Sequence, residues 1–203
     1  MTQAPAPRCA PAAERNLAPI MASLGRHAPA SGRALEIASG TGQQIPRFAA
    51  AHPGLIWQAT DRDPANLETM RAWAALAPAP NLLPPLLLDA AQPGWATAFA
   101  PCALVLMVNL LHLISDLEAA VVLQEAALAL APQGRLMVYG PFLRAGRTTS
   151  PGDAEFHAAL RAADPTTGYK DIAWVQAQLA AQGLDTRTED MPANNLMLVA
   201  FRT

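Results

Sequence analysis

The stretch "LEIASGTGQ" at residues 35–43 decides how the chain is expected to fold and where it is expected to bind a ligand. A short apolar run ends here with Glu36 inside it, and Gly40 and Gly42 follow among small residues. Glycine allows a turn with positive φ and lets a ligand approach the backbone closely. The stretch therefore predicts a strand, a glycine-rich loop and a helix, with a ligand lying against the loop.

The rest of the chain predicts one α/β domain. Its 203 residues, 52% of them hydrophobic, suffice for one sizeable core. Apolar runs, among them predicted strands at 82–88 and 136–139, alternate with segments of helical pattern. One predicted helix begins with a capping box of Ser115 and Glu118 and runs to near Pro132. This alternation favours a parallel sheet with helices on both faces. The last two predicted strands, at 184–189 and 196–201, are joined by the turn-rich "DMPANN", which indicates an antiparallel pair. We expect a disordered tail over residues 1–10 and a single domain over 11–203, with a helix over 11–28 that could cap the site.

Composition argues against several classes of protein. The net charge is −2 and Lys170 is the one lysine, so a surface that follows nucleic-acid phosphates is not expected. The apolar runs fall short of the roughly 18 residues typical of a membrane span, and the start of the chain lacks the layout of a signal peptide. The histidines form no metal-ligand pair, and Cys9 and Cys102 are expected as free thiols. We therefore expect a cytoplasmic protein without a metal centre, either monomer or homodimer.

Carboxylates follow the second and third predicted strands, at the end where ligands bind in such sheets. "WQATDRD" places Asp61 at the tip of the second strand, where it is predicted to accept both hydroxyls of a ribose. Asp63 precedes Pro64 and is predicted to cap the next helix. Asp89 follows the third strand in "LLLDA" and could accept from an adenine amino group, with Ala90 supplying a backbone N–H. A helix-capping role for Asp89 is the alternative.

Two cofactors suit a strand and glycine loop with an acidic residue about 20 positions further on. A dinucleotide requires a third glycine where this chain has Ile45, and its pyrophosphate would lie beside the charge of Glu36. S-adenosylmethionine instead carries a cationic sulfonium and a cationic amino group, which a neighbouring carboxylate attracts. The loop therefore predicts S-adenosylmethionine, with an ordinary strand-to-helix turn as the alternative. The predicted cofactor contacts from the loop and the N-terminal helix are Glu36, Ala38, Ser39, Gly40, Thr41, Gly42, Gln43, Arg15 and Asn16.

Candidate catalytic residues follow the fourth and fifth predicted strands. Asn109 is the first polar residue after an apolar strand, and it could position an acceptor or contact the methionine end of the cofactor. His112 is the only histidine in such a loop, and because histidine titrates near about 6.5 it is a candidate general base. It could equally pack among the neighbouring leucines. Tyr139 could wall the pocket or belong to the core.

The glycine loop and further motifs resemble those of a known family. Glu36, Ala38, Gly40 and Gly42 match the E/D-x-G-x-G-x-G pattern of class I methyltransferases, with Ala38 in place of the first glycine. With "ERN", "WQATD", "YGPF" and "MPANN", they resemble a small methyltransferase-like family of unassigned substrate, from Glu14 to the end of the chain. The resemblance implies a Rossmann-like class I methyltransferase fold. Its seven-stranded, mostly parallel sheet has the order 3-2-1-4-5-7-6, with strand 7 antiparallel.

The function that these patterns favour is S-adenosylmethionine-dependent methyl transfer to an oxygen, nitrogen or sulfur of a small molecule. A non-catalytic module that binds S-adenosylmethionine or a nucleoside would share the cofactor loop. An oxidoreductase that uses NAD(P) is less favoured, because its short-chain form needs a lysine four positions after a tyrosine. Tyr139 is followed at that spacing by Leu143, and Tyr169 by Ala173.

Overall fold

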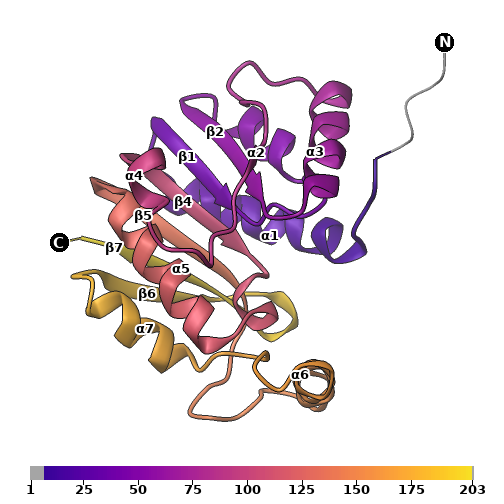
Figure 1. Cartoon of the computed structure of the whole chain (residues 1–203), viewed down its shortest axis with the longest axis vertical. Coiled ribbons are helices and arrows are strands. Elements are labelled where there is room, and N and C mark those ends of the chain that lie inside the picture. Colours follow the sequence, from indigo (N-terminus) through magenta and orange to yellow (C-terminus); the bar gives the residue numbers. More distant parts are fainter. Residues whose placement is uncertain (1–6, 203) are drawn as a thin grey trace.

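A seven-stranded sheet forms the centre of the protein, in a computed structural model that describes residues 7–202 (Figure 1). The strand order is β3-β2-β1-β4-β5-β7-β6. β7 runs antiparallel to both of its neighbours, and the remaining pairs are parallel. The predicted fold is therefore confirmed in both strand order and strand direction. The strands are β1 (Gly32–Ile37), β2 (Leu55–Asp61), β3 (Leu86–Leu87), β4 (Cys102–Val108), β5 (Leu130–Pro141), β6 (Asp185–Asp190) and β7 (Asn195–Phe201).

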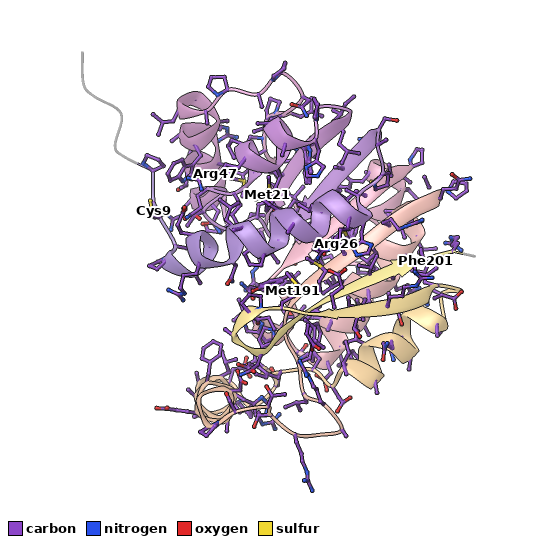
Figure 2. The ribbon with its side chains drawn as sticks, turned by 180° about the vertical axis from the view of Figure 1, so that it is seen from behind. Cys9, Met21, Arg26, Arg47, Met191 and Phe201 are labelled. Atoms are coloured by element: carbon purple, nitrogen blue, oxygen red, sulfur yellow. The ribbon has the colours of Figure 1, made fainter. Side chains whose placement is uncertain are left out.

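Helices cover both faces of this sheet. α1, α2 and α3 contribute side chains to the core on one face, and α4, α5 and α7 to the core on the other (Figures 1 and 2). The helices are α1 (Pro11–His27), α2 (Ile45–Ala51), α3 (Pro64–Leu76), α4 (Ala96–Phe99), α5 (Asp116–Ala129), α6 (Pro151–Ala163) and α7 (Ile172–Ala180), with short 3-10 turns η1 (Leu111–Leu113) and η2 (Pro192–Asn194).

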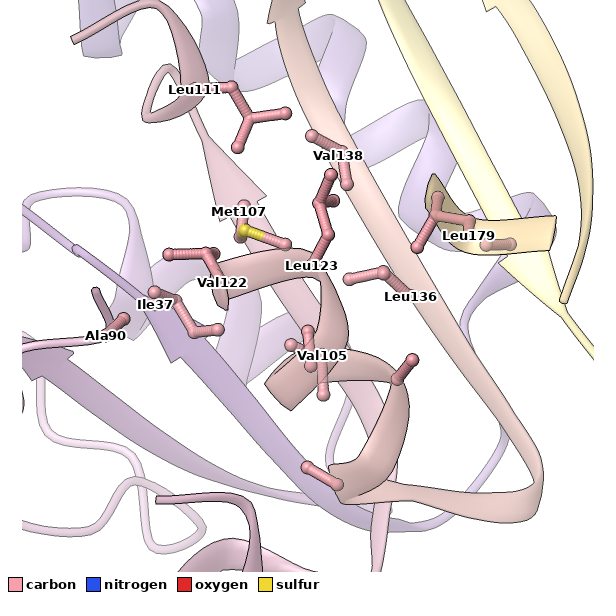
Figure 3. Packing of buried hydrophobic residues seen from close by; sticks show 14 of the residues in the cluster. Ile37, Ala90, Val105, Met107, Leu111, Val122, Leu123, Leu136, Val138 and Leu179 are labelled. Atoms are coloured by element: carbon pink, nitrogen blue, oxygen red, sulfur yellow. The ribbon is translucent and has the colours of Figure 1, made fainter. Parts of the chain in front are cut away.

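The two cores follow from the alternation of side chains along each strand. In β1, Leu35 and Ile37 belong to the core under α5. Ala34 points to the other face and belongs to the core under α1. Figure 3 shows the first core, where Val105 and Met107 of β4 lie beneath side chains of α5. The β4 sequence is apolar throughout, as expected of a central parallel strand that is covered on both faces. In β1 only the last four residues, Ala34 to Ile37, are buried, and Glu36 is among them.

α6 differs from the other long helices, because none of its residues is buried. It lies beside the sheet rather than on it, at the lower end of the view in Figure 1. Its side chains reach the rest of the chain through aromatic contacts of Phe156 and His157 and through a few polar contacts. Asn194 Nδ2 donates to Asp153 Oδ2 (3.0 Å), and the backbone N–H of Tyr169 donates to His157 Nδ1 (3.0 Å).

The structure confirms the predicted helix starts at two places. Asp63 accepts a hydrogen bond from the backbone N–H of Ala65 (2.9 Å) at the start of α3. At the start of α5, Ser115 and Glu118 form a complete capping box. Both motifs depend only on residues within one helical turn, which is why the sequence identifies them.

Three predicted elements have other bounds in the structure. The helix expected to run to Pro132 stops at Ala129, and β5 begins at once, earlier than the strand predicted over residues 136–139. The register between β4 and β5 shifts between Cys102 and Leu104, which accommodates this irregular start. The strand predicted over residues 82–88 is reduced to β3, because Pro84 and Pro85 cannot donate to a ladder.

The expected tail falls partly outside the described residues, since residues 1–6 are not described. Residues 7–10 are held against the domain. Arg8 Nη2 donates to Asn66 Oδ1 (2.7 Å), and the carbonyl of Arg8 accepts from Trp73 Nε1 (3.1 Å). The backbone N–H of Ala10 donates to Gln43 Oε1 (2.6 Å), which ties the start of α1 to the glycine loop.

Candidate functional site

A pocket of about 230 Å³ lies at the carboxyl ends of the parallel strands. After β1 the chain adds β2 and β3 toward one edge of the sheet, and after β4 it adds β5 toward the other edge. The loops after β1 and β4 therefore part at this point, the switch where ligands bind in open α/β sheets. The pocket is lined by Ala38, Gly40, Asp61, Arg62, Asn66, Leu88, Asp89, Ala90, Ala91, Asn109, Leu110, Leu113, Ile114 and Val122.

The two glycines of the loop are needed for different reasons. Both have positive φ, 57° at Gly40 and 72° at Gly42. A Cβ atom on Gly40 would meet nothing within 4 Å, so this backbone is open to the pocket. A Cβ on Gly42 would overlap the Met70 side chain and lie 3.0 Å from the Met70 Cα atom on α3. Gly40 thus leaves room for a ligand, whereas Gly42 lets the loop pack against a helix.

Two residues other than glycine also have left-handed backbones at the pocket. Ala38 has φ of 54° at the end of β1, and Asn109 has φ of 56° at the end of β4. This conformation costs an L-residue roughly 1–2 kcal/mol. Both residues line the pocket. Such local strain is concentrated at binding sites and catalytic sites in proteins.

Asp61 joins the glycine loop to the tip of β2. Its Oδ2 accepts from the backbone N–H of Gly40 (2.9 Å), and its Oδ1 accepts from the backbone N–H of Asp63 (2.9 Å). The side chain is buried yet lines the pocket. Each carboxylate oxygen has a second lone pair, so both can still accept hydrogen bonds from a ligand.

Asp89 and Ala90 lie at the far side of the pocket, after β3. Asp89 Oδ1 accepts from the backbone N–H of Ala91 (3.1 Å), so the carboxylate stabilises a turn rather than capping a helix. Its side chain remains exposed at the edge of the pocket.

Glu36 is buried beneath the glycine loop, and only 3% of the residue is exposed. Its Oε2 atom has no hydrogen-bond partner among residues 7–202. Burial raises the pKa of the Glu36 carboxyl to about 7. A buried carboxylate without a partner is costly, and a cation close by would offset that cost.

The predicted catalytic residues separate in space. Asn109 lines the pocket, but His112 and Tyr139 do not. The His112 ring lies edge-on to Phe156 (5.9 Å between centroids) and Tyr169 (6.0 Å). Burial, and secondarily the charge of Lys170, lowers the pKa of His112 to about 4. A base this weak is poorly matched to proton transfer near neutral pH.

Tyr139 lies in the core under α1, almost fully buried. Within the described part of the chain its hydroxyl has no hydrogen-bond partner, and burial raises the pKa of Tyr139. Successive side chains of β5 point to opposite faces of the sheet. Val138 belongs to the core under α5, so Tyr139 points to the other face, into the core under α1. The packing corresponds to the core alternative considered for this residue.

The remaining predicted contacts do not line the pocket. The Gln43 side chain is used within the protein, where it bonds to Ala10 at the start of α1. On α1, Arg15 is exposed and Asn16 half-buried. The predicted residues that do not line the pocket are Arg15, Asn16, Glu36, Ser39, Thr41, Gly42, Gln43, His112 and Tyr139.

Several residues that line the pocket were not predicted. Arg62 and Asn66 follow the acidic tip of β2, and the signal for them was their position beside Asp61. Leu110, Leu113 and Ile114 belong to the loop after β4, where only polar residues had been considered. They give the pocket an apolar wall opposite the two carboxylates.

Two general features bear on the class of protein. Among the described residues, none of the helices combines the length and the apolar character needed to cross a membrane. Within residues 7–202, no group of three histidine, cysteine, aspartate or glutamate side chains is arranged to hold a metal ion.

Solved structures share this fold at low sequence identity. An O-methyltransferase family protein from Burkholderia thailandensis matches with a TM-score of 0.81 and 18% identity, over 95% of this chain and 57% of that one. The mitomycin 7-O-methyltransferase MmcR matches with a TM-score of 0.78 and 18% identity, over 95% and 54% of the two chains. CalO1, a methyltransferase in calicheamicin biosynthesis solved with SAH bound, matches with a TM-score of 0.73 and 19% identity, again over 95% and 54%. This chain therefore spans little more than half the length of these proteins.

One protein family matches nearly the whole chain. Its description reads "Protein of unknown function (DUF938)", and the match runs over residues 7–202, the same residues that form the layered α/β structure. The chain belongs to this family.

Proposed function

We propose that the protein is an S-adenosylmethionine-dependent methyltransferase that acts on a small molecule. The observation that carries the proposal is the open backbone of Gly40, with two carboxylates near it. They are the strand-tip carboxylate of Asp61 and the buried carboxylate of Glu36, whose Oε2 atom has no partner among the described residues. When bound, the cofactor supplies a methyl group on a cationic sulfur. The methyltransferase names of the structural neighbours, one of them solved with SAH, support this assignment.

The residues of the pocket fit the parts of this cofactor. Asp61 can accept from the ribose hydroxyls, and Asp89 with Ala90 can hold the adenine edge. Glu36 lies beneath the loop, where it can stabilise the cationic end, because a positive charge lowers the cost of ionising a buried carboxyl. Asn109 stands at the end of β4, where it can orient an acceptor.

The acceptor is expected to be small and weakly charged. Leu110, Leu113 and Ile114 give the pocket an apolar wall, and 51% of Leu113 remains exposed at its edge. Methyl transfer depends mainly on holding the acceptor in line with the methyl group, so a wall of fixed side chains can contribute without a general base. A base role for His112 remains a prediction, which its packing does not favour.

S-adenosylmethionine or its demethylated product should stabilise the folded protein, whereas NAD should not. At a ligand concentration near 100 times the dissociation constant the expected gain is about 2.7 kcal/mol. For a domain of this size that corresponds to roughly 5–10 °C in melting temperature. Thermal unfolding with each ligand at millimolar concentration provides the measurement. An unchanged melting temperature with both forms of the cofactor would exclude the proposed function.

The substitution Asp61→Asn should weaken cofactor binding about tenfold or more, because two ribose hydroxyls lose a charged acceptor. Asp63→Ala is the matched control two positions along. It should lower the free energy of unfolding by about 1 kcal/mol through loss of the α3 cap and leave affinity nearly unchanged. Calorimetric titration and chemical unfolding of both variants would separate the two roles. Exchanged phenotypes would show that the ribose contact is assigned to the wrong carboxylate.

A non-catalytic cofactor-binding module is the second candidate. The position of His112 favours it, because a catalytic base in the loop after β4 would be expected to face the pocket rather than Phe156 and Tyr169. Incubation with methyl-labelled cofactor and a cell extract distinguishes the two functions. A labelled small molecule indicates an enzyme, whereas cofactor binding without any labelled product indicates the module.

A further inference from the structure

A group of arginines lies at the end of the sheet opposite the cofactor pocket, on the face that carries α1. Two neighbouring pockets of about 210 and 380 Å³ share His27 and Arg135. Figure 2 shows this face, with Arg26 near the end of α1 and Phe201 near the end of β7. The first pocket also includes Arg187, and the second includes Arg202. We call the first of the two the arginine pocket; it is lined by Arg26, His27, Arg135, Arg187, Val199 and Phe201.

Two of the guanidinium groups lie against the aromatic ring of Phe201. The Arg135 carbon Cζ lies 5.3 Å from the centre of the Phe201 ring, and the Arg187 Cζ lies 5.2 Å from it. These two carbons are therefore no more than about 10.5 Å apart. Sheet register explains the arrangement, because Arg135 of β5 pairs with Phe201, and Arg187 of β6 pairs with Val199 two residues before it.

Glu189 of β6 is a carboxylate near this pocket that is already paired with residues of α1. Glu189 accepts from Arg26 Nη2 (2.8 Å) and Ser23 Oγ (2.8 Å), and it also pairs with His27. These hydrogen bonds, that from Arg26 foremost, lower the pKa of Glu189 to about 2, so it stays ionised at neutral pH. Glu189 is therefore paired with residues of α1 rather than with Arg135 or Arg187.

Two of the other guanidinium groups, those of Arg135 and Arg202, donate hydrogen bonds to neutral acceptors. Arg135 Nη1 donates to the backbone carbonyls of Gln133 (2.9 Å) and Gly134 (3.3 Å), and Arg202 Nη2 to that of Ala127 (3.3 Å). Asp185, opposite Phe201 in the register, is a second carboxylate at this end. Even with both carboxylates counted, four guanidiniums outnumber them, in a chain whose net charge is −2.

We propose that the arginine pocket binds a phosphate-type oxyanion, either free phosphate or the phosphate group of a small ester. Guanidinium groups present paired N–H donors that match such an oxyanion, and several converging on one site bind it more tightly than a single charge. An oxyanion in this pocket would also reduce the repulsion among the guanidinium groups that line it. This site is separate from the cofactor pocket and does not depend on the proposed function.

The test compares phosphate binding by the wild type and by matched variants. Inorganic phosphate and glycerol 3-phosphate are titrated against the whole protein by calorimetry, with sodium chloride of equal ionic strength as the reference. Arg187→Gln and Arg187→Lys alter an exposed side chain, so both are expected to fold. Arg71→Gln, an exposed arginine paired with Glu68 on α3, is the control for loss of one positive charge elsewhere.

We expect saturable binding of at least one of the two phosphate compounds to the wild type and to Arg71→Gln. Arg187→Gln should weaken it about tenfold or more, and Arg187→Lys should also weaken it, because lysine keeps the charge but loses the paired donors. Binding of the ester alone would identify the ligand as a phosphate ester, and the site would stand. Failure of both compounds to bind beyond the chloride reference would overturn the proposal, as would unchanged affinity in Arg187→Gln or Arg187→Lys.

Discussion

Glu36→Gln and His112→Phe should change the pH dependence of stability in opposite directions, each by about 3 kcal/mol. Burial raises the pKa of Glu36 from 4.5 to about 7 and lowers the pKa of His112 from 6.5 to about 4. Each pKa unit corresponds to about 1.4 kcal/mol. The two groups therefore have large effects over nearly the same range of pH.

The sign of each effect follows from which state binds more protons. Between pH 4.5 and about 7 the folded state holds a proton on Glu36 that the unfolded state has lost, so stability falls as pH rises. Between about pH 4 and 6.5 the unfolded state holds a proton on His112 that the folded state lacks, so stability rises with pH. In the wild type these two contributions nearly cancel.

Urea unfolding of the ligand-free protein at several pH values separates them. Glu36→Gln leaves the histidine contribution, so stability should increase from pH 4 to 6.5. His112→Phe keeps a ring for packing but does not titrate, so stability should decrease from pH 4.5 to 7. Parallel pH profiles for the wild type and both variants would show that neither group has the shift its burial indicates.

Gly42→Ala should lower the free energy of unfolding by about 3 kcal/mol. A left-handed backbone costs alanine roughly 1–2 kcal/mol, and overlap with a packed side chain typically costs about 1–3 kcal/mol. The added methyl group would press on Met70, whose Cα atom lies 3.0 Å away and cannot move without α3. Because typical domains are stable by about 5–15 kcal/mol, this loss should be plain in a denaturant titration.

Gly40→Ala provides the matched control. Its φ is also in the left-handed region, but the added methyl group meets nothing within 4 Å. We expect a smaller loss of stability, about 1–2 kcal/mol, together with weaker cofactor binding because the methyl group projects into the pocket. Equal losses of stability in the two variants would contradict the division of roles between these glycines.

Local signals in the sequence predicted the frame of the site. Asp63 and Ser115 cap their helices as expected, because a cap depends on residues one turn apart. The order of carboxylates along the chain likewise placed Asp61 and Asp89 at neighbouring strand ends, and both line the pocket. Sequence order and strand direction together determine which loops meet at this edge of the sheet.

The direction of individual side chains was harder to predict. His112 belongs to the expected loop, yet its ring turns toward Phe156 of α6, a helix 40 or so residues later whose position depends on tertiary packing. Tyr139 ends the expected strand, but alternation along β5 sends it under α1. The arginine pocket had no local signal, because Arg135 and Arg187 come together only through the pairing of β5, β7 and β6. Arg26 joins them from α1, where it pairs with Glu189 of β6.

The shallow attachment of α6 has a consequence for how the family can diverge. Since none of its residues is buried, substitutions along this helix leave the two cores intact and cost little stability. Phe156, 46% exposed, nevertheless touches the His112 ring in the loop that also lines the pocket. Selection can therefore reshape the surroundings of this loop through α6 without the compensating changes that a core substitution requires.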